Sequence, residues 1–538
     1  MSTSRRVDSA LARAISRRRF VQGLAVGAGG LAGGLLLGCQ SSGTSATAGP
    51  ASGAGPVRGG TLNVAVLVDI SPTAGNLSLA HSRSGTNFQM LGAVYDRLIR
   101  YSSDSFKANP ELAESFSFSS DYRSLTFKLR PGVKFHNGRP VTAEDVKWNI
   151  ERVTDPTASP QFSSFAKWVQ RMETPDASTL VLSFDQARPS ILDLFEFLSI
   201  ADPQTYQQSL DGKNFVGTGP FMFKEWVPGD HYTMVRNPDY WQKDLPYLDE
   251  VSAKLIPDPS SQLINLQTGA IDVAAAVDAR DAKSLENDKN YFISTYVIRS
   301  HVLYMGVDVK APIFSDKRAR QALAYLIDRK RIIDSVLIYG EEAPILWGKD
   351  SPAYDDELAK RYSFNLDKAK ELLAQVQKPD VTIPINTNSA QPYQVGVAEI
   401  VQAELAKVGI KSSVEKLQPA EYTKKWTAGE FRGLWTSNVG YLYLSPSTPF
   451  ILAFPLRIPN SSNYESPEYK AAIDGLLKAG TEAEIKKAAR PLNEILVDEA
   501  FVIPISKTMN PVAVSAKVKG WELTRANGWK IEKFWKSK

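Results

Sequence analysis

Residues 127–146, FKLRPGVKFHNGRPVTAEDV, combine two predicted turns with the start of a predicted helix. In RPGV (130–133) the proline ring fixes one backbone dihedral and the glycine permits a positive φ, so this tetrapeptide predicts a tight turn. The HNG triplet (136–138) predicts a second turn. TAED (142–145) has the spacing of a capping box and therefore predicts that a helix begins there.

The rest of the chain alternates strand-like and helix-like patterns. Residues 61–68 predict the first strand and residues 501–505 a late one. Three further helices are expected where apolar residues recur at helical spacing: one that begins at residue 315 or 316, one over 397–408 that ends at Gly409, and one that begins at the capping box 481–484. Mixed helices and strands over 538 residues imply an α/β protein with more than one lobe.

The stretch 127–146 resembles the signature of the peptide/nickel solute-binding proteins of ABC importers. Further blocks that are similar to this family occur in the expected order, namely YDRL (95–98), PELAES (110–115), GTGPF (217–221), RNPDYW (236–241) and the segment 312–328. The resemblance extends over about residues 60–538. On these blocks the chain is identified as a member of the family.

The resemblance implies a two-lobed periplasmic-binding-protein fold of type II, α/β in class, with an extra subdomain and a hinge that closes on the ligand. The predicted division is a leader (1–38), a tether (39–60), lobe one (61–87, 216–298 and 501–538), its extra subdomain (88–215) and lobe two (299–500). It also implies a monomer that carries a peptide or peptide-like solute to permease subunits. Oligosaccharides, haem, modified amino-acid conjugates and metal complexes remain open as alternative ligands.

The leader accounts for the whole formal net charge of +5. It carries six arginines and one acid, and the rest of the chain has equal numbers of basic and acidic residues. Arg17 and Arg18 precede Phe20 in a sequence that resembles a twin-arginine export motif, although an ordinary signal peptide with incidental arginines is the alternative. The neutral body gives no support for nucleic-acid binding, which needs a clustered basic surface.

The only cysteine, Cys39, ends the sequence LLGC (36–39), which looks like a bacterial lipoprotein cleavage site. More than one acyl chain on this residue would make a stable anchor. The alternative is a cysteine buried in an apolar run. Residues 40–60 are rich in Ser, Thr, Ala, Gly and Pro and predict a flexible tether. We therefore expect an exported protein, held by lipid at the outer face of the cytoplasmic membrane or periplasmic.

The best candidate for the ligand pocket is the segment 432–441, RGLWTSNVGY. In peptide-binding relatives, a tryptophan here is followed three residues later by an aspartate that pairs with the ligand's α-amino group. Trp435 matches the tryptophan, and Asn438 stands in the place of the aspartate. Because a neutral amide offers only a dipole to an ammonium group, the resemblance implies a ligand without a free amino group there, unless another acid substitutes.

Three more residues complete the predicted site. Arg432 is a candidate partner for an anionic group, and Tyr441 for a planar or sugar surface. Asp69 follows the first predicted strand, at an exit that lies at the cleft in relatives, and the resemblance implies that it or another acid could replace the missing aspartate. For each of these residues, as for Trp435 and Asn438, the alternative is core packing or an ordinary surface position.

Two blocks of the signature have both a structural and a chemical interpretation. The glycines of GTGP (217–220) could present backbone N–H groups to an anion, or they could form a turn where the chain crosses between lobes. His136 could be a ligand, or it could belong to its turn. The structural interpretation is favoured for both.

An exported cofactor enzyme is the main alternative of another class. The sequence lacks Gly-x-Ser-x-Gly, His-Glu-x-x-His, a dinucleotide-binding glycine motif and a phosphate loop. Its four histidines are scattered and the body has no cysteine, so neither a metal nor a cofactor is expected. A binding module that signals to a receptor, and feeds no transporter, is a further alternative.

Overall fold

The computed structural model describes residues 55–70, 92–154, 162–377, 380–525 and 528–537. Arg17, Arg18, Cys39 and most of the predicted tether lie outside the described residues. None of the described helices is long and apolar enough to cross a bilayer.

The largest sheet has eleven strands among the described residues, in the order β15-β14-β16-β12-β17-β11-β1-β10-β9-β8, with β13 paired to β17. In that order, with β13 last, the strands are Ser412–Leu417, Ile383–Asn388, Leu434–Val439, Tyr291–Val307, Val502–Ser515, Val273–Ala274, Thr61–Val66, Glu250–Leu255, His231–Arg236, Phe221–Val227 and Gly340–Glu342. The predicted first strand therefore ends two residues early, and Leu67 and Val68 are exposed. The late strand, expected over 501–505, instead extends to Ser515.

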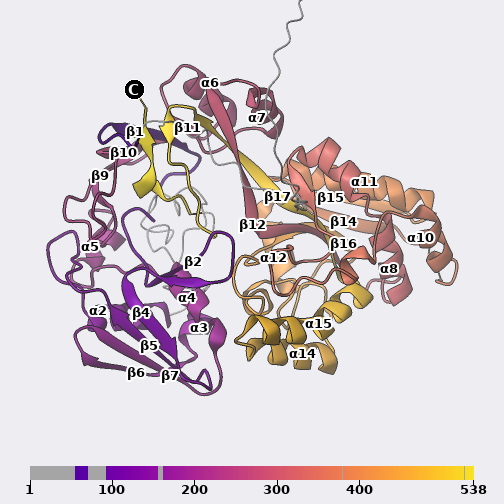
Figure 1. Ribbon diagram of the computed structural model, residues 1–538. Helices are drawn as coiled ribbons and strands as arrows, with labels where there is room; N and C mark the ends of the chain where they lie inside the picture. Colours follow the sequence, from indigo (N-terminus) through magenta and orange to yellow (C-terminus); the bar gives the residue numbers. More distant parts are fainter. Residues whose placement is uncertain (1–54, 71–91, 155–161, 378–379, 526–527, 538) are drawn as a thin grey trace, which may run out of the picture. The chain divides into compact units, whose positions relative to one another are not determined.

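Strands β12 and β17 occupy the middle of this sheet and pair with each other antiparallel (Figure 1). The far end of β12, residues 302–307, pairs with β16, whereas the far end of β17, residues 513–514, pairs with β11. Their register shifts between Val297 and Val302. These two strands therefore connect β14–β16 to the group formed by β1 and β8–β11.

Helices cover both faces of the β14–β16 portion. Leu303 of β12 and Leu434 of β16 belong to a core shared with α8, α10 and α11 on one face. Tyr304 and Trp435 belong to a second core, shared with α12, α14 and α15, on the other. The helices are α8 (Lys317–Leu326), α10 (Leu366–Leu373), α11 (Pro392–Lys407), α12 (Pro419–Ala428), α14 (Pro467–Leu477) and α15 (Glu482–Glu499).

A separate four-stranded sheet, in the order β4-β5-β7-β6, contains the first three residues of the stretch 127–146 in β5, and the stretch ends inside α2. Its strands are Ala113–Phe118, Ser124–Leu129, Thr179–Phe184 and Val169–Asp176, and it packs with α2 (Ala143–Thr154), α3 (Ser163–Ala166) and α4 (Leu192–Phe197). The remaining elements are β2 (Ile99–Tyr101), β3 (Ala108–Pro110), α5 (Tyr206–Leu210), α6 (Pro259–Gln267), α7 (Ala279–Leu285), α9 (Arg329–Ile332), α13 (Pro449–Leu452), β18 (Val518–Lys519) and β19 (Trp535–Lys536).

The predicted caps are present. Thr481 and Glu484 form a reciprocal capping box at the start of α15. Thr142 precedes α2, and its backbone N–H donates to the Asp145 carboxylate at 2.8 Å. Gly409 follows α11 with a φ of +77°, and Ile410 N–H donates back to Leu405 O, which closes the helix. The predicted helix ends are therefore confirmed. Sequence can predict them because a capping residue bonds to residues within one turn of its own position.

Candidate ligand-binding site

Strand β16 presents the two central candidates on opposite faces of the sheet. Trp435 is fully buried in the core shared with α12, α14 and α15, and its indole N–H donates to Tyr304 Oη at 3.2 Å. Asn438 lies three residues on, so its side chain points the other way, toward α11. The structure therefore does not bring these two side chains together, and the position of Trp435 agrees with the core-packing alternative.

Asn438 is half-buried and only partly hydrogen-bonded. Its Nδ2 donates to Tyr393 Oη at 2.7 Å, near the start of α11. Its Oδ1 is buried and has no hydrogen-bond partner among the described residues. Burial raises the pKa of Tyr393, so this hydroxyl stays neutral. Asn438 is thus an uncharged polar group with an acceptor left open.

Arg432 precedes β16 and is largely exposed, with 68% of its side chain accessible. Its Nη1 donates to the carbonyl oxygens of Gly429 and Phe431 at 3.2 Å. The buried carboxylate of Asp308 is 4.0 Å away, too far for a close ion pair. The guanidinium is therefore accessible to an anionic group from solution.

Tyr441 follows β16 with a φ of +68°, a region that bulky residues rarely adopt. Its ring packs against the core of residues 98–200, which also includes Tyr443 and Leu444. The turn at Tyr441 therefore directs the segment after β16 toward the four-stranded sheet and α4.

The side chain of Asp193 in α4 is hydrogen-bonded to this segment. Its buried carboxylate accepts hydrogen bonds from Ser445 N–H, at 3.1–3.2 Å, and from the Thr448 hydroxyl. Tyr101 Oη donates to it as well, at 2.6 Å. Burial raises the pKa of Asp193 to about 6, while these donors oppose the shift. One carboxylate thus connects two segments that are about 250 positions apart in sequence.

Asp69 is hydrogen-bonded to the β8–β9 hairpin. Its carboxylate accepts from Trp226 Nε1 at 2.9 Å and from Gly229 N–H at 2.7 Å. A third donor is the backbone N–H of Ile70. The structure therefore gives Asp69 a role in fixing this hairpin.

Three blocks of the signature meet at Asp96. Its carboxylate accepts from Thr218 Oγ1 (3.0 Å), Tyr240 Oη (3.1 Å) and Trp241 Nε1 (2.9 Å). Asp96 is 1% exposed, and burial raises its pKa to about 7. The YDRL, GTGPF and RNPDYW blocks therefore form one buried network, here called the Asp96 network (Asp96, Thr218, Tyr240 and Trp241).

The glycines of the second block pack against backbone. A Cβ on Gly217 would lie 2.2 Å from Val94 O, and one on Gly219 would lie 2.5 Å from Ala93 O. His136 Nε2 lies 3.0 Å from Gly219 O, and burial lowers the pKa of His136 to about 4. Close backbone contact, not an anion cradle, explains these glycines, and His136 belongs to the same contact.

The described residues contain no group of three or more His, Cys, Asp or Glu side chains that could hold a metal ion.

A model of the bacterial extracellular solute-binding proteins, family 5, matches residues 107–456. This chain belongs to family 5. Its members are binding proteins and not enzymes, which confirms both the resemblance and the non-enzymatic prediction.

Among family 5 relatives, heme-binding protein A of Haemophilus influenzae is 26% identical over 472 residues, which cover 80% of this chain and 84% of that protein. The oligopeptide-binding protein AppA of Bacillus subtilis is 27% identical over 408 residues, 70% and 72% of the two chains. The solved structure of AgaA from A. tumefaciens R10, in complex with agropinic acid, is 26% identical, covers 89% and 99%, and has a TM-score of 0.75. The α/β periplasmic-binding-protein fold that the sequence predicted for this chain is therefore confirmed.

Sequence reasoning missed Asp193 and its partners. One signal was available, because Asp193 and Glu196 interrupt the apolar run ILDLFEFLSI (191–200), and both are fully buried. An acid inside such a run predicts a carboxylate with specific donors. The identity of those donors, Ser445 and Thr448, could not be read from sequence spacing.

Proposed function

We propose that this protein is the solute-binding subunit of an ABC importer and binds a peptide or peptide-like solute between two lobes. The family 5 match across residues 107–456 is the observation that carries the proposal. AppA, named as an oligopeptide-binding protein, supports the peptide assignment. We expect a monomer that delivers its solute to permease subunits.

The proposed lobes keep the borders given above. Two observations support them. The borders near residues 298 and 500 fall within β12 and immediately before β17, the strands that connect the two groups of the large sheet. Residues 441–448 contact α4 through Asp193, which is the kind of contact that a closed form makes.

Asn438 supports a ligand whose group at this position is uncharged. The amide has an open acceptor, and Tyr393 adds a neutral hydroxyl. The substitute acid considered above, Asp69, already accepts three hydrogen bonds from its own neighbours. An N-blocked peptide, a cyclic peptide or an acylated conjugate fits this chemistry better than a free ammonium, which needs a counter-charge when it is desolvated.

A non-peptide solute is the second candidate within the same fold. The relatives named for haem and solved with agropinic acid support it, because both show family 5 members that take other solutes. Asn438 near one end of β16 and the exposed guanidinium of Arg432 before its other end suit an extended acidic conjugate as well as an acylated peptide.

We also propose export through the twin-arginine route and a lipid anchor on Cys39, as the sequence predicts. Replacing Cys39 with Ala should abolish fatty-acid labelling and leave a soluble or unprocessed precursor. Replacing Arg17 and Arg18 with Lys should block export. Labelling of Cys39→Ala, or normal export of the double variant, would contradict the respective assignment.

Native mass spectrometry on protein purified without denaturation tests the ligand proposal. We expect a bound peptide or N-blocked conjugate, which should raise the melting temperature because it binds only the folded form. Small-angle scattering should then show a smaller radius of gyration with the recovered ligand. Recovery of a tetrapyrrole or a sugar instead would favour the second candidate.

A further inference from the structure

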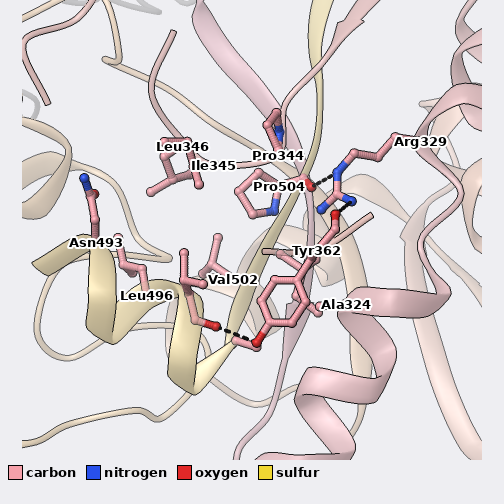
Figure 2. A pocket seen from close by; sticks show the side chains of 13 residues that line it. Ala324, Arg329, Pro344, Ile345, Leu346, Tyr362, Asn493, Leu496, Val502 and Pro504 are labelled. Atoms are coloured by element: carbon pink, nitrogen blue, oxygen red, sulfur yellow. Dashed lines mark hydrogen bonds between the residues drawn. The ribbon is translucent and has the colours of Figure 1, made fainter. Parts of the chain in front are cut away.

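A small cavity lies between α8, α9, α15 and the start of β17, within the part of the chain that contains β14–β16 (Figure 2). It gives about 20 Å³ to the centre of a water-sized sphere. A single water needs at least ~10–15 Å³ by this measure, so the cavity has room for one small particle. Its lining is mainly apolar and includes Ala324, Leu346, Leu496, Val502 and Pro504.

Arg329 is the only charged residue in this lining. It is 4% exposed, and its Nε donates to Pro504 O at 3.0 Å, while its Nη1 donates to Tyr362 O at 2.9 Å (Figure 2). Its Nη2 is buried and has no hydrogen-bond partner among the described residues. Two strong donors of a buried cation are therefore unused.

The other two polar residues of the lining already have partners. Tyr362 Oη donates to Val497 O at 3.0 Å. Asn493 accepts from Trp347 Nε1 at 2.7 Å and donates to Ala353 O at 2.8 Å. A molecule or ion bound in the cavity would therefore meet hydrogen-bond donors, chiefly those of Arg329. It would meet no carboxylate.

The guanidinium charge also lacks a close counter-charge. No carboxylate of the described residues lies within 4 Å of it, and Glu342, the acid that acts on it electrostatically, is exposed. Burial lowers the pKa of Arg329 to about 10, so the group is still charged at neutral pH. A buried cation with only carbonyl oxygens around it is costly unless an anion balances it.

We propose that Arg329 holds one small monovalent anion, such as chloride, in this cavity. The space that a water-sized sphere can occupy, about 20 Å³, matches one small ion. The N–H donors and the positive charge of Arg329 exclude a metal cation. The anion compensates the buried charge of Arg329 and thereby stabilises the packing of α9 and α15 against β17.

Bromide, which scatters anomalously, tests the site in the unaltered protein. Crystals grown from the full chain in sodium bromide should show an anomalous peak in contact with Arg329 Nη2. A water at Nη2 without such a peak at saturating bromide would overturn the proposal. This measurement does not depend on any variant that fails to fold.

Thermal unfolding supplies a second readout. At constant ionic strength, replacing gluconate by chloride should raise the melting temperature by about 1 °C for each tenfold increase in chloride above its dissociation constant. Arg329→Met should lose this response, and Arg361→Met, which removes an exposed arginine of the same region, should keep it. An equal chloride response in Arg329→Met would contradict the assignment.

Discussion

Asp96 and Asn438 are polar side chains in two different parts of the chain. The carboxylate of Asp96 is fully hydrogen-bonded, whereas the amide of Asn438 is only partly hydrogen-bonded. Both carboxylate oxygens of Asp96 have donors, and two other blocks of the chain supply them. Asn438 has one partner and an open, buried acceptor. The comparison shows that Asp96 and its donors satisfy one another, whereas Asn438 keeps an unused acceptor at the position where we propose that the ligand binds.

The largest expected effect is at the Asp96 network. Asp96→Ala leaves two buried donors and one partly buried donor without their acceptor, each at a cost of about 1–3 kcal/mol, so we expect a loss of about 3–5 kcal/mol in the free energy of unfolding. Denaturant titration measures it. Asp239→Ala is the matched control, since Asp239 is exposed in the same RNPDYW block, and should change stability by less than ~0.5 kcal/mol. Equal losses of stability in the two variants would show that the buried hydrogen bonds of Asp96 contribute no more than an exposed carboxylate.

The next effect concerns Asp193, which links the segment after β16 to α4. Its pKa is raised from 3.8 to about 6 in the folded protein, so the folded state binds its proton more tightly than the unfolded state. The stability that this group contributes is therefore present below pH 3.8 and is lost as pH rises toward 6, by about 3 kcal/mol. Asp193→Asn removes this titration.

Denaturant titrations of both proteins between pH 4 and 7 measure the effect. The stability of the unaltered protein, relative to Asp193→Asn, should fall as pH rises across this range. A constant offset between the two proteins is expected as well, because the amide is a poorer acceptor for Ser445 N–H. A difference that does not change with pH would show that Asp193 is not buried as described.

A smaller effect is expected at Gly219. Its missing Cβ allows the backbone of residues 93–95 to approach, so Gly219→Ala should destabilise by about 1–3 kcal/mol through overpacking. Gly475→Ala is the control, because nothing lies within 4 Å of that Cβ position inside α14, and it should stabilise by up to ~1 kcal/mol. Similar changes in thermal midpoint for both variants would contradict the close approach.

Local sequence signals predicted the ends of α2, α11 and α15, because a cap lies next to the residues that it caps. They did not predict the Asp96 network, since Asp96 and Trp241 are 145 positions apart. The resemblance grouped Trp435 with Asn438, although a spacing of three places strand residues on opposite faces. Strand periodicity was therefore the better guide at β16, and the resemblance the better guide to the fold.

Isothermal calorimetry with matched peptides, free and N-acetylated, tests the central claim most directly. A charge-assisted hydrogen bond is worth about 1.5–3 kcal/mol. The unaltered protein should therefore bind the acetylated peptides at least about tenfold more tightly, and Asn438→Asp should reverse this preference. Asn388→Asp, which adds the same charge on neighbouring β14, should leave the preference unchanged. Tighter binding of free peptides by the unaltered protein, with no change in Asn438→Asp, would contradict the account.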